Sequence, residues 1–420
     1  MSSTKEQKIY IIGAGISGLI AALNLEKAGF HPIMLEKDKA VGGRVQTDQV
    51  DGFLLDRGFQ VLLEAYPKAQ EYLDYDNLEL QPLSSGAVLF SNGKGEYFGD
   101  PLRESKFLFP TITSSAGSLS DKWKIFRLNR SLQGKDLDAV FEHREQTTLD
   151  YLKDYGFSDK IIHSFFRPFF SGIYLEPNLD TSSRMFEYVY KLFGKGRAMI
   201  PKGGIGAISD QLKSKLLNTE IRLSCTVDKV ESGMITLSNG EQLKSDFTII
   251  ASNPGTLLAN YASTLLWKSC DNLYFKTPTR TIKDPVIGLS KHEDSFVNNI
   301  FYPTSVATTE KGNEELLSVT VVKKHELSPE ALIEQVTQEL QSIFGISGIE
   351  FLKHYPISMA LPNLQDLQYN RESRESLLTE HIAIAGDHQL NGSLNAAMIS
   401  GENAATAALT AINKELIPMS

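Results

Sequence analysis

The sequence of residues 11–18 is Ile11-Ile12-Gly13-Ala14-Gly15-Ile16-Ser17-Gly18. It joins an apolar run over residues 8–12, which predicts a buried strand, to a segment over residues 17–28 that predicts a helix ending before Gly29. A strand, a glycine-rich turn and a helix in this order are typical of the first unit of a nucleotide-binding α/β sheet.

Each glycine of the turn has a physical role in such a unit. Gly13 permits the tight turn, Gly15 lets the backbone approach a pyrophosphate, and Gly18 lets the helix pack closely on the strand. The unpaired amides and the partial positive charge of the helix N-terminus then face the phosphates. The turn therefore predicts a dinucleotide site.

A second apolar run, residues 32–35, ends in Glu36 and is followed by Lys37. Glu36 lies 18 residues beyond Gly18, close to the ~20 residues expected for an acid that binds a ribose diol. A 2′-phosphate would be repelled there. Glycine turns also occur as plain connections between a strand and a helix, but the flanking strand, helix and acid together favour the nucleotide site.

Length and composition restrict the class of protein. A chain of 420 residues predicts two or three domains, and 41% hydrophobic with 22% charged residues is typical of a soluble globular protein. The net charge of -9 argues against nucleic-acid partners.

The two cysteines, Cys225 and Cys270, have no nearby Cys or His in metal-ligand spacing, which indicates neither a disulfide framework nor a metal site. The apolar stretch of residues 9–25 follows Lys5 and Lys8 as in a signal peptide, but the glycine turn explains it better. No other segment approaches 18 apolar residues, so we predict no transmembrane helix and expect a cytoplasmic protein.

The alternation of strands and helices is interrupted twice, which predicts a discontinuous arrangement. We expect a nucleotide-binding domain from residues 1–80, 197–255 and 380–420, where the last unit repeats the opening as strand, loop and helix. Residues 81–196 and 256–379, which are rich in aromatic side chains in their first part, are expected to form a second, substrate-binding domain.

A basic and apolar helix is predicted near residues 120–132, with Ser120-Asp121 as its cap. Four basic residues alternate there with Trp123, Ile125, Phe126 and Leu128, close to Phe107-Leu108-Phe109-Pro110. Such a helix could rest on an anionic membrane surface, or it could be a solvated helix whose lysine and arginine stems cover the domain. We favour the solvated helix.

Motifs in three separate parts of the chain resemble those of the flavin amine oxidase superfamily, which includes phytoene desaturases, protoporphyrinogen oxidases and monoamine oxidases. The opening turn with Glu36 and the following Gly42-Gly43-Arg44 resemble its first two FAD motifs, and Pro201-Lys202-Gly203-Gly204 resembles its middle motif. Residues 385–387 and 392–401, which contain Gly386-Asp387, resemble its closing motif.

The resemblance implies an α/β fold: a Rossmann-like FAD-binding domain of the glutathione reductase type, discontinuous in sequence, with an inserted α+β substrate domain. Arg44 would meet the pyrophosphate, Asp387 the ribityl chain, and the helix beginning near Leu394 and Asn395 the pyrimidine edge of the flavin. Asp387 could instead merely cap a helix or a turn. The cofactor-binding residues implied are Gly13, Ala14, Gly15, Ile16, Ser17, Gly18, Glu36, Lys37, Gly43, Arg44, Gly58, Phe59, Gln60, Val227, Gly386, Asp387, Leu394 and Asn395.

The resemblance also implies a reaction: removal of two electrons from a substrate, with hydride passing to flavin N5. The FAD is expected to be non-covalent, because no cysteine lies in the closing motif. The segments 167–174 and 179–184 resemble the desaturase and protoporphyrinogen oxidase branch, which implies an apolar or conjugated substrate. No catalytic residue is identified, and of the histidines His388, beside Asp387, is the one to test.

Two other functions stay open at this point. One is an amine oxidase that uses oxygen. The other is a non-catalytic escort that binds lipid or prenyl groups, as Rab GDP-dissociation inhibitors do on a similar fold; the joint presence of Glu36, Arg44 and Asp387 argues against it. The electron acceptor, with oxygen and a quinone as candidates, is not identified.

Overall fold

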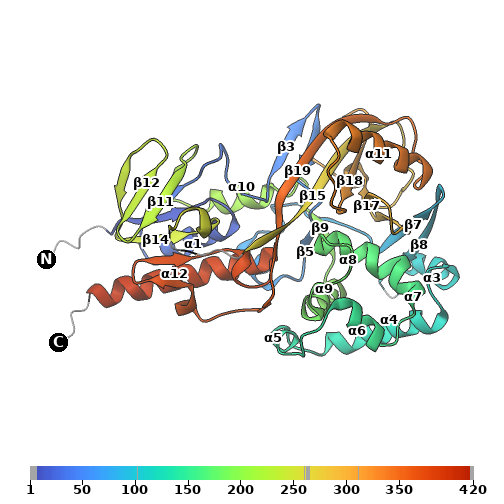
Figure 1. The fold of residues 1–420 in the computed structure, drawn as a ribbon, viewed down its shortest axis with the longest axis horizontal. Coiled ribbons are helices and arrows are strands. Elements are labelled where there is room, and N and C mark those ends of the chain that lie inside the picture. The colour runs from blue at the N-terminus through green and yellow to red at the C-terminus, as the bar shows by residue number, and fades with distance from the viewer. Residues whose placement is uncertain (1–6, 102, 260, 262–264, 311, 417–420) are drawn as a thin grey trace.

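The computed structural model describes residues 7–101, 103–259, 261, 265–310 and 312–416 (Figure 1). A six-stranded sheet contains the predicted opening strand and is parallel except at one edge. Its strands, in spatial order, are β10 (Glu220–Arg222), β2 (Ile33–Leu35), β1 (Ile9–Ile12), β14 (Phe247–Ile250), β21 (Ile382–Ile384) and the antiparallel β20 (Leu377–Thr379).

Both faces of this sheet are buried, and the side chains of β1 alternate between the two faces. Ile9 and Ile11 pack in the core that holds α1 (Ile16–Lys27) and α12 (Leu394–Leu416). Tyr10 and Ile12 pack against the meander β11 (Val227–Glu231), β12 (Met234–Leu237) and β13 (Gln242–Lys244). Burial on both sides explains why β1 has a continuous apolar sequence.

Helices α1 and α12 lie against each other, although their starts at Ile16 and Leu394 are 378 positions apart in sequence (Figure 1). The approach depends on Gly401, because a Cβ there would lie 2.3 Å from the carbonyl oxygen of Ser17. Helices α1 and α12, which lie far apart in sequence, therefore belong to one structural unit.

A seven-stranded sheet forms the second large unit. Its spatial order is β19 (Glu350–Asn363), β15 (Leu266–Thr277), β18 (Glu315–Val321), β17 (Val297–Phe301), β16 (Ile287–Ser290), β7 (Gly86–Ser91) and β8 (Lys94–Gly99). The parallel pairing of β16 with β7 joins segments about 200 residues apart in sequence. Helix α11 (Pro329–Ser342) packs on this sheet through Leu332, Val336 and Leu340.

Helices fill most of residues 105–195 and gather beside the second sheet (Figure 1). They are α3 (Leu108–Thr113), α4 (Leu119–Gln133), α5 (Leu137–Phe141), α6 (Thr148–Asp154), α7 (Asp159–Ile161), a π-helical turn (Ile162–Phe166), α8 (Arg167–Tyr174) and α9 (Ser183–Lys195). No helix among the described residues has both the length and the apolar content that crossing a membrane would require.

Shorter elements complete the fold. They are the hairpin β3 (Thr47–Val50) and β4 (Phe53–Asp56), helices α2 (Pro67–Tyr72) and α10 (Ala207–Ser214), and a small sheet of β5 (Leu62–Leu63), β9 (Ala198–Ile200) and β6 (Gln81–Pro82).

The predicted cap of α4 is wrong. Ser118 is the N-cap, and it forms a reciprocal capping box with Asp121 at the third helical position, so the helix starts one residue before Ser120. Asp121 thus completes the cap instead of beginning the helix.

Candidate functional site

The glycine turn between β1 and α1 is packed from behind and open in front. A Cβ on Gly13 would lie 2.8 Å from the carbonyl oxygen of Ala251, and one on Gly18 would lie 2.1 Å from that of Gly13. A Cβ on Gly15, by contrast, would meet only the carbonyl oxygen of Gly42, at 4.0 Å. The backbone at Gly15 is therefore open to the approach of a ligand.

Glu36 lies at the carboxyl end of β2 and is buried. Its Oε2 accepts a hydrogen bond from the amide of Ala14 at 2.6 Å, and its Oε1 accepts one from the amide of Asp38 at 2.9 Å. Each oxygen keeps a further lone pair for a ligand hydroxyl. Glu36 therefore braces the glycine turn in addition to facing the cavity described below, a structural role that the sequence did not indicate.

The second and closing motifs meet through an ion pair. Arg44 Nη2 lies 2.5 Å from Asp387 Oδ1, and the guanidinium also lies over the ring of Trp267, 5.2 Å from its centroid. Burial would raise the pKa of Asp387, but the charge of Arg44 and its hydrogen bond hold that pKa below the ordinary value. Because the carboxylate is directed at Arg44, Asp387 is more than a helix or turn cap.

Serine side chains hold the backbone on either side of Asp387 through hydrogen bonds. The amide of Gly386 donates to Ser400 Oγ at 3.0 Å, and Ser393 Oγ accepts from the amide of Ala396 as the first turn of α12 begins. In the part of the chain that the structure describes, the amides of Leu394 and Asn395 have no acceptor. They remain available to a ligand at the N-terminus of a long helix.

A single large cavity of about 2510 Å³ runs along all these groups. It begins at the glycine turn, passes Arg44 and Asp387, and continues among the aromatic side chains of α8 and α9, such as Phe169 and Phe193. Ordinary ligand pockets measure roughly 300–1,000 Å³, so this cavity has room for a dinucleotide and a second molecule.

Most of the predicted cofactor residues line this cavity, and three do not. Those lining it are Gly13, Gly15, Ile16, Ser17, Glu36, Lys37, Gly43, Arg44, Gly58, Phe59, Gln60, Val227, Gly386, Asp387 and Leu394. Ala14 contributes its amide to Glu36, and Gly18 packs against the turn from behind.

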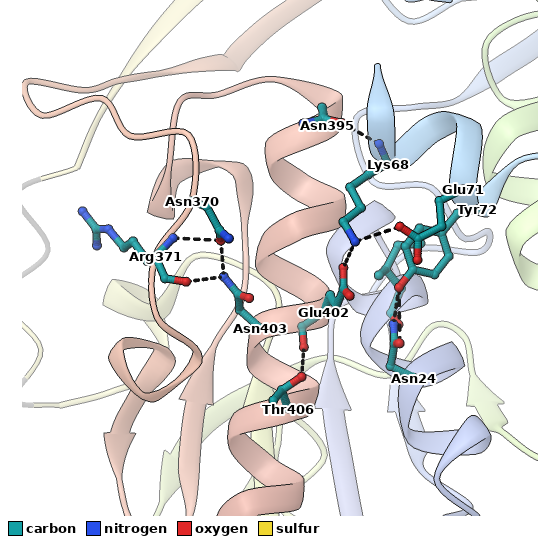
Figure 2. Close-up of polar contacts among 11 residues, drawn as sticks. Asn24, Lys68, Glu71, Tyr72, Asn370, Arg371, Asn395, Glu402, Asn403 and Thr406 are labelled. Carbon is teal, nitrogen blue, oxygen red and sulfur yellow. Dashed lines mark hydrogen bonds and ion pairs between the residues drawn. The ribbon is translucent and has the colours of Figure 1, made fainter. Parts of the chain in front are cut away.

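The third residue outside the lining is Asn395, whose side chain is directed away from the cavity. It is fully buried, and its Oδ1 accepts a hydrogen bond from the backbone amide of Lys68 at 2.9 Å (Figure 2). The Lys68 ammonium in turn bridges Glu71 on α2 and Glu402 on α12 (Figure 2). Asn395 therefore anchors α2 on α12, and only its backbone amide remains a candidate ligand contact.

The side chain of Gln60 is directed at the neighbouring backbone. Its Nε2 donates to the carbonyl oxygens of Arg44, at 2.9 Å, and Arg57, at 3.2 Å, while Phe59 packs on Phe301 with ring centroids 5.1 Å apart. Gln60 thus holds the backbone of the residue that forms the ion pair with Asp387.

The middle motif, Pro201-Lys202-Gly203-Gly204, packs on an element of the cavity wall and does not itself line the cavity. Gly203 and Gly204 are absent from the lining; a Cβ on Gly204 would lie 2.5 Å from Thr47 Oγ1, so the motif packs on the β3–β4 hairpin. Asp56 at the end of that hairpin accepts hydrogen bonds from Thr47 Oγ1 and from the amide of Ile205. Burial raises the pKa of Asp56 to about 6 despite these two bonds.

Lys268 on β15 is a cavity residue that the sequence did not reveal. Its Nζ lies 2.9 Å from Thr181 Oγ1, and burial lowers the pKa of the ammonium although Glu176 and Asp180 act in the opposite direction. No local spacing marks it, because Thr181 is 87 residues away.

His388, the histidine that the sequence singled out for testing, lines the cavity beside Asp387. Its Nε2 is buried and has no hydrogen-bond partner among the described residues. Burial lowers the pKa of this imidazole, although the neighbouring Asp387 carboxylate acts in the opposite direction. The lowered pKa favours the neutral form of the ring.

Comparison with known proteins agrees with this geometry. Residues 16–409 match the model of the flavin containing amine oxidoreductase family. The chain is 26% identical over 286 residues to a 4,4'-diapolycopene oxygenase of Methylomonas sp, with 59% of this chain and 56% of the relative covered. It is 23% identical to the coproporphyrinogen III oxidase of Bacillus subtilis, with 59% and 60% covered.

These two alignments thus span little more than half the length of each curated relative. Among solved structures, the CLA-producing fatty acid isomerase from P. acnes superposes with a TM-score of 0.72 at 15% identity, covering 96% of this chain and 99% of that one. At this identity the likeness shows the fold alone, which is the expected Rossmann-like domain with an added substrate domain.

Proposed function

The chain belongs to the flavin-containing amine oxidoreductase family, and on that premise we propose that it is an oxidoreductase that holds FAD non-covalently and oxidises an apolar or conjugated substrate. The observation that carries the proposal is the continuity of the cavity. One space connects the glycine turn, the Arg44–Asp387 pair and the aromatic side chains of the helical region.

The residues present fit three groups of FAD: the pyrophosphate, the ribose and the edge of the flavin ring. The open face of Gly15 and the N-terminus of α1 suit a pyrophosphate, and Glu36 at the end of β2 suits a ribose diol. The free amides of Leu394 and Asn395 suit the polar edge of the ring, where the α12 dipole stabilises negative charge. FAD bound there would supply the acceptor of two electrons and a hydride.

Non-covalent binding is supported by the two cysteines of the cavity. Burial raises the pKa of the Cys270 thiol to about 12, which keeps it protonated and poorly nucleophilic. Cys225 lies two residues before Val227, at the end of the cavity near the glycine turn. Neither thiol is part of the closing motif.

Converting a single bond of the substrate into a double bond removes one hydride and one proton. We assign proton uptake to Lys268 Nζ, because burial lowers the pKa of this group and it faces the cavity next to Trp267, which packs on Arg44. Thr181 Oγ1 holds the amine in position. Phe165, Phe169, Ile173 and Phe193 supply apolar walls to the part of the cavity in the helical region.

We also propose the domain division expected from the sequence, with one adjustment. Strands β1, β2, β10, β14 and β21 support a nucleotide-binding domain built from residues 1–80, 197–255 and 380–420. Strand β20 pairs with β21 in the same sheet, so the last segment of that domain is better begun before Leu377.

The test begins with the purified full chain. It should carry flavin absorbance or acquire it with added FAD, and acid precipitation should leave the flavin in the supernatant. Anaerobic addition of polyenes, porphyrinogens, unsaturated fatty acids and amines should identify a class that bleaches the flavin, and admitting oxygen or a quinone then identifies the acceptor. A folded chain that does not bind FAD would overturn the proposal and favour an escort, and bleaching by amines alone would favour an amine oxidase.

A further inference from the structure

The N-terminal ends of α2 and α12 lie next to each other, and both border the cavity. Leu63 and Tyr66, directly before α2, line the cavity, and so do Leu394 and Ala397 in the first turn of α12. The edge of the flavin ring is proposed to lie against the free amides at the start of α12. Contacts between α2 and α12 therefore decide where those amides stand relative to the cavity.

The side chain of Asn395 joins the two helices. Asn395 and Lys68 are each the second residue of their helix, and the amide of Lys68 is one that a helix leaves without an intrahelical partner. Tyr66, the N-cap of α2, makes no side-chain capping bond. Asn395 Oδ1 supplies the acceptor for the Lys68 amide at 2.9 Å (Figure 2).

The rest of the Asn395 side chain is less constrained. The residue is fully buried, and its Nδ2 has no hydrogen-bond partner among the described residues. The bond to the Lys68 amide therefore sets the orientation of this side chain, and with it the contact between the two helix starts.

The ammonium of Lys68 makes a second connection, two turns along α12. Its Nζ lies 2.8 Å from Glu71 Oε2 on α2 and 2.5 Å from Glu402 Oε2 on α12 (Figure 2). Glu402 follows Asn395 by seven residues, so both lie on one face of α12. Burial would lower the pKa of Lys68, but its hydrogen bonds to Glu402 and Glu71 raise that pKa above the ordinary value, which keeps the bridge charged. We call Asn395, Lys68 and Glu402 the α2–α12 clamp.

Another contact of α12 has the same chemistry but a different place. Asn403 Nδ2 donates to Asn370 Oδ1 at 2.9 Å and to the carbonyl oxygen of Arg371 at 3.1 Å (Figure 2). Asn403, Asn370 and Arg371 do not line the cavity. Asn403 therefore helps to pack α12 without joining it to a cavity wall, and it is a reference for the clamp.

From these contacts we infer that the α2–α12 clamp is a positioning device that raises the reduction potential of the flavin. It holds the first turn of α12 so that the amides of Leu394 and Asn395 point at the flavin edge, where reduction places negative charge. The side chains of Asn395 and Lys68 do not line the cavity, so they act through the α12 backbone. The inference rests on the proposed function, because it requires a flavin in the cavity.

The test uses the full chain loaded with FAD and measures the reduction potential against a reference dye, without any substrate. Asn395→Ala should weaken binding of reduced flavin about tenfold more than binding of oxidised flavin, which lowers a two-electron potential by about 30 mV. Lys68→Met should shift the potential in the same direction but less, because the backbone amide of Lys68 remains. Lys68→Arg keeps a cation between the two carboxylates and should return the potential toward that of the wild type.

The matched control is Asn403→Ala, which removes side-chain hydrogen bonds of the same kind from the same helix and should leave the potential unchanged. Urea unfolding should show a loss of stability in both asparagine variants. A shift in potential confined to the clamp variants then reports the position of α12 and not a general loosening. Because Asn395 and Lys68 act on one contact, the double variant Asn395→Ala/Lys68→Met should shift the potential by less than the sum of the single shifts.

Unchanged potentials in Asn395→Ala and Lys68→Met, with FAD bound, would overturn the inference, and so would an equal shift in Asn403→Ala. If Asn395→Ala does not fold, Lys68→Met and Glu402→Gln, at partly exposed positions, decide between these outcomes. A wild-type chain that binds no FAD would reject the proposed function and this inference with it. Bound FAD with the same potential in every variant would reject the inference alone.

Discussion

Arg44 Nη2 lies 2.5 Å from Asp387 Oδ1, across 343 residues of sequence. The pair ties the loop after β2 to the loop before α12, and the guanidinium is 40% exposed while the carboxylate is 5% exposed. The ion pair therefore holds Arg44 and Asp387, the two side chains proposed to contact the cofactor, next to each other. Of the two, Arg44 is the more accessible from the cavity.

Replacing Asp387 by Ala should destabilise the folded chain and weaken FAD binding. The arginine loses its partner, which costs about 1–3 kcal/mol since Arg44 keeps partial contact with water. Urea unfolding and FAD titration measure the two effects. Asp387→Asn is the matched control, since it keeps an acceptor oxygen and should retain more FAD affinity than Asp387→Ala. Equal FAD affinity in the wild type and both variants would remove Asp387 from the site.

Replacing Glu36 by Gln should weaken FAD binding by about tenfold or more, because one amide oxygen must replace two carboxylate oxygens that accept from Ala14 and Asp38 and, in the proposed complex, from the ribose. Quenching of flavin fluorescence during titration measures the affinity. Glu220→Gln, on the exposed edge strand β10, is the control and should bind as the wild type does. If Glu36→Gln lowers only the unfolding midpoint, Glu36 braces the turn and has no part in binding.

Lys268→Met should lower the turnover of a reducing substrate by about 10²–10⁴-fold while leaving FAD bound, because the proton loses its acceptor. Lys268→Arg should not restore activity, since a guanidinium does not release its proton. Lys276→Met, farther along β15 and paired with Asp51, is the control. The pH profile of kcat/KM should show a basic group below the ordinary lysine value that is lost in Lys268→Met; an unchanged profile would assign Lys268 a structural role.

Asp56 should make the protein less stable as the pH rises. Its folded pKa is about 6 against an ordinary value of 3.8, so between these values the folded state holds a proton that the unfolded state has released. Urea midpoints measured from about pH 4 to pH 7 should fall across this window. Asp56→Asn should flatten that part of the curve, and an identical slope in the variant would contradict the buried environment assigned to Asp56.

The sequence by itself determined the elements whose signals are local. The glycine turn, the strand ending in Glu36 and the final helix were predictable, because turn geometry, apolar runs and caps depend on residues a few positions apart. For the same reason the motifs at Arg44 and Asp387 could be recognised separately. Most of the residues predicted for the cofactor do line one cavity.

Only the tertiary structure decided what these residues face. It brought Arg44 to Asp387, placed Lys268 next to Thr181, turned the side chain of Asn395 toward α2, and directed Trp123 outward. A local pattern gives the face of a helix or strand but not the element that covers it, because the cover comes from distant parts of the chain. The closing ion pair, the shape of the cavity and the attachment of α2 to α12 all depend on that long-range packing.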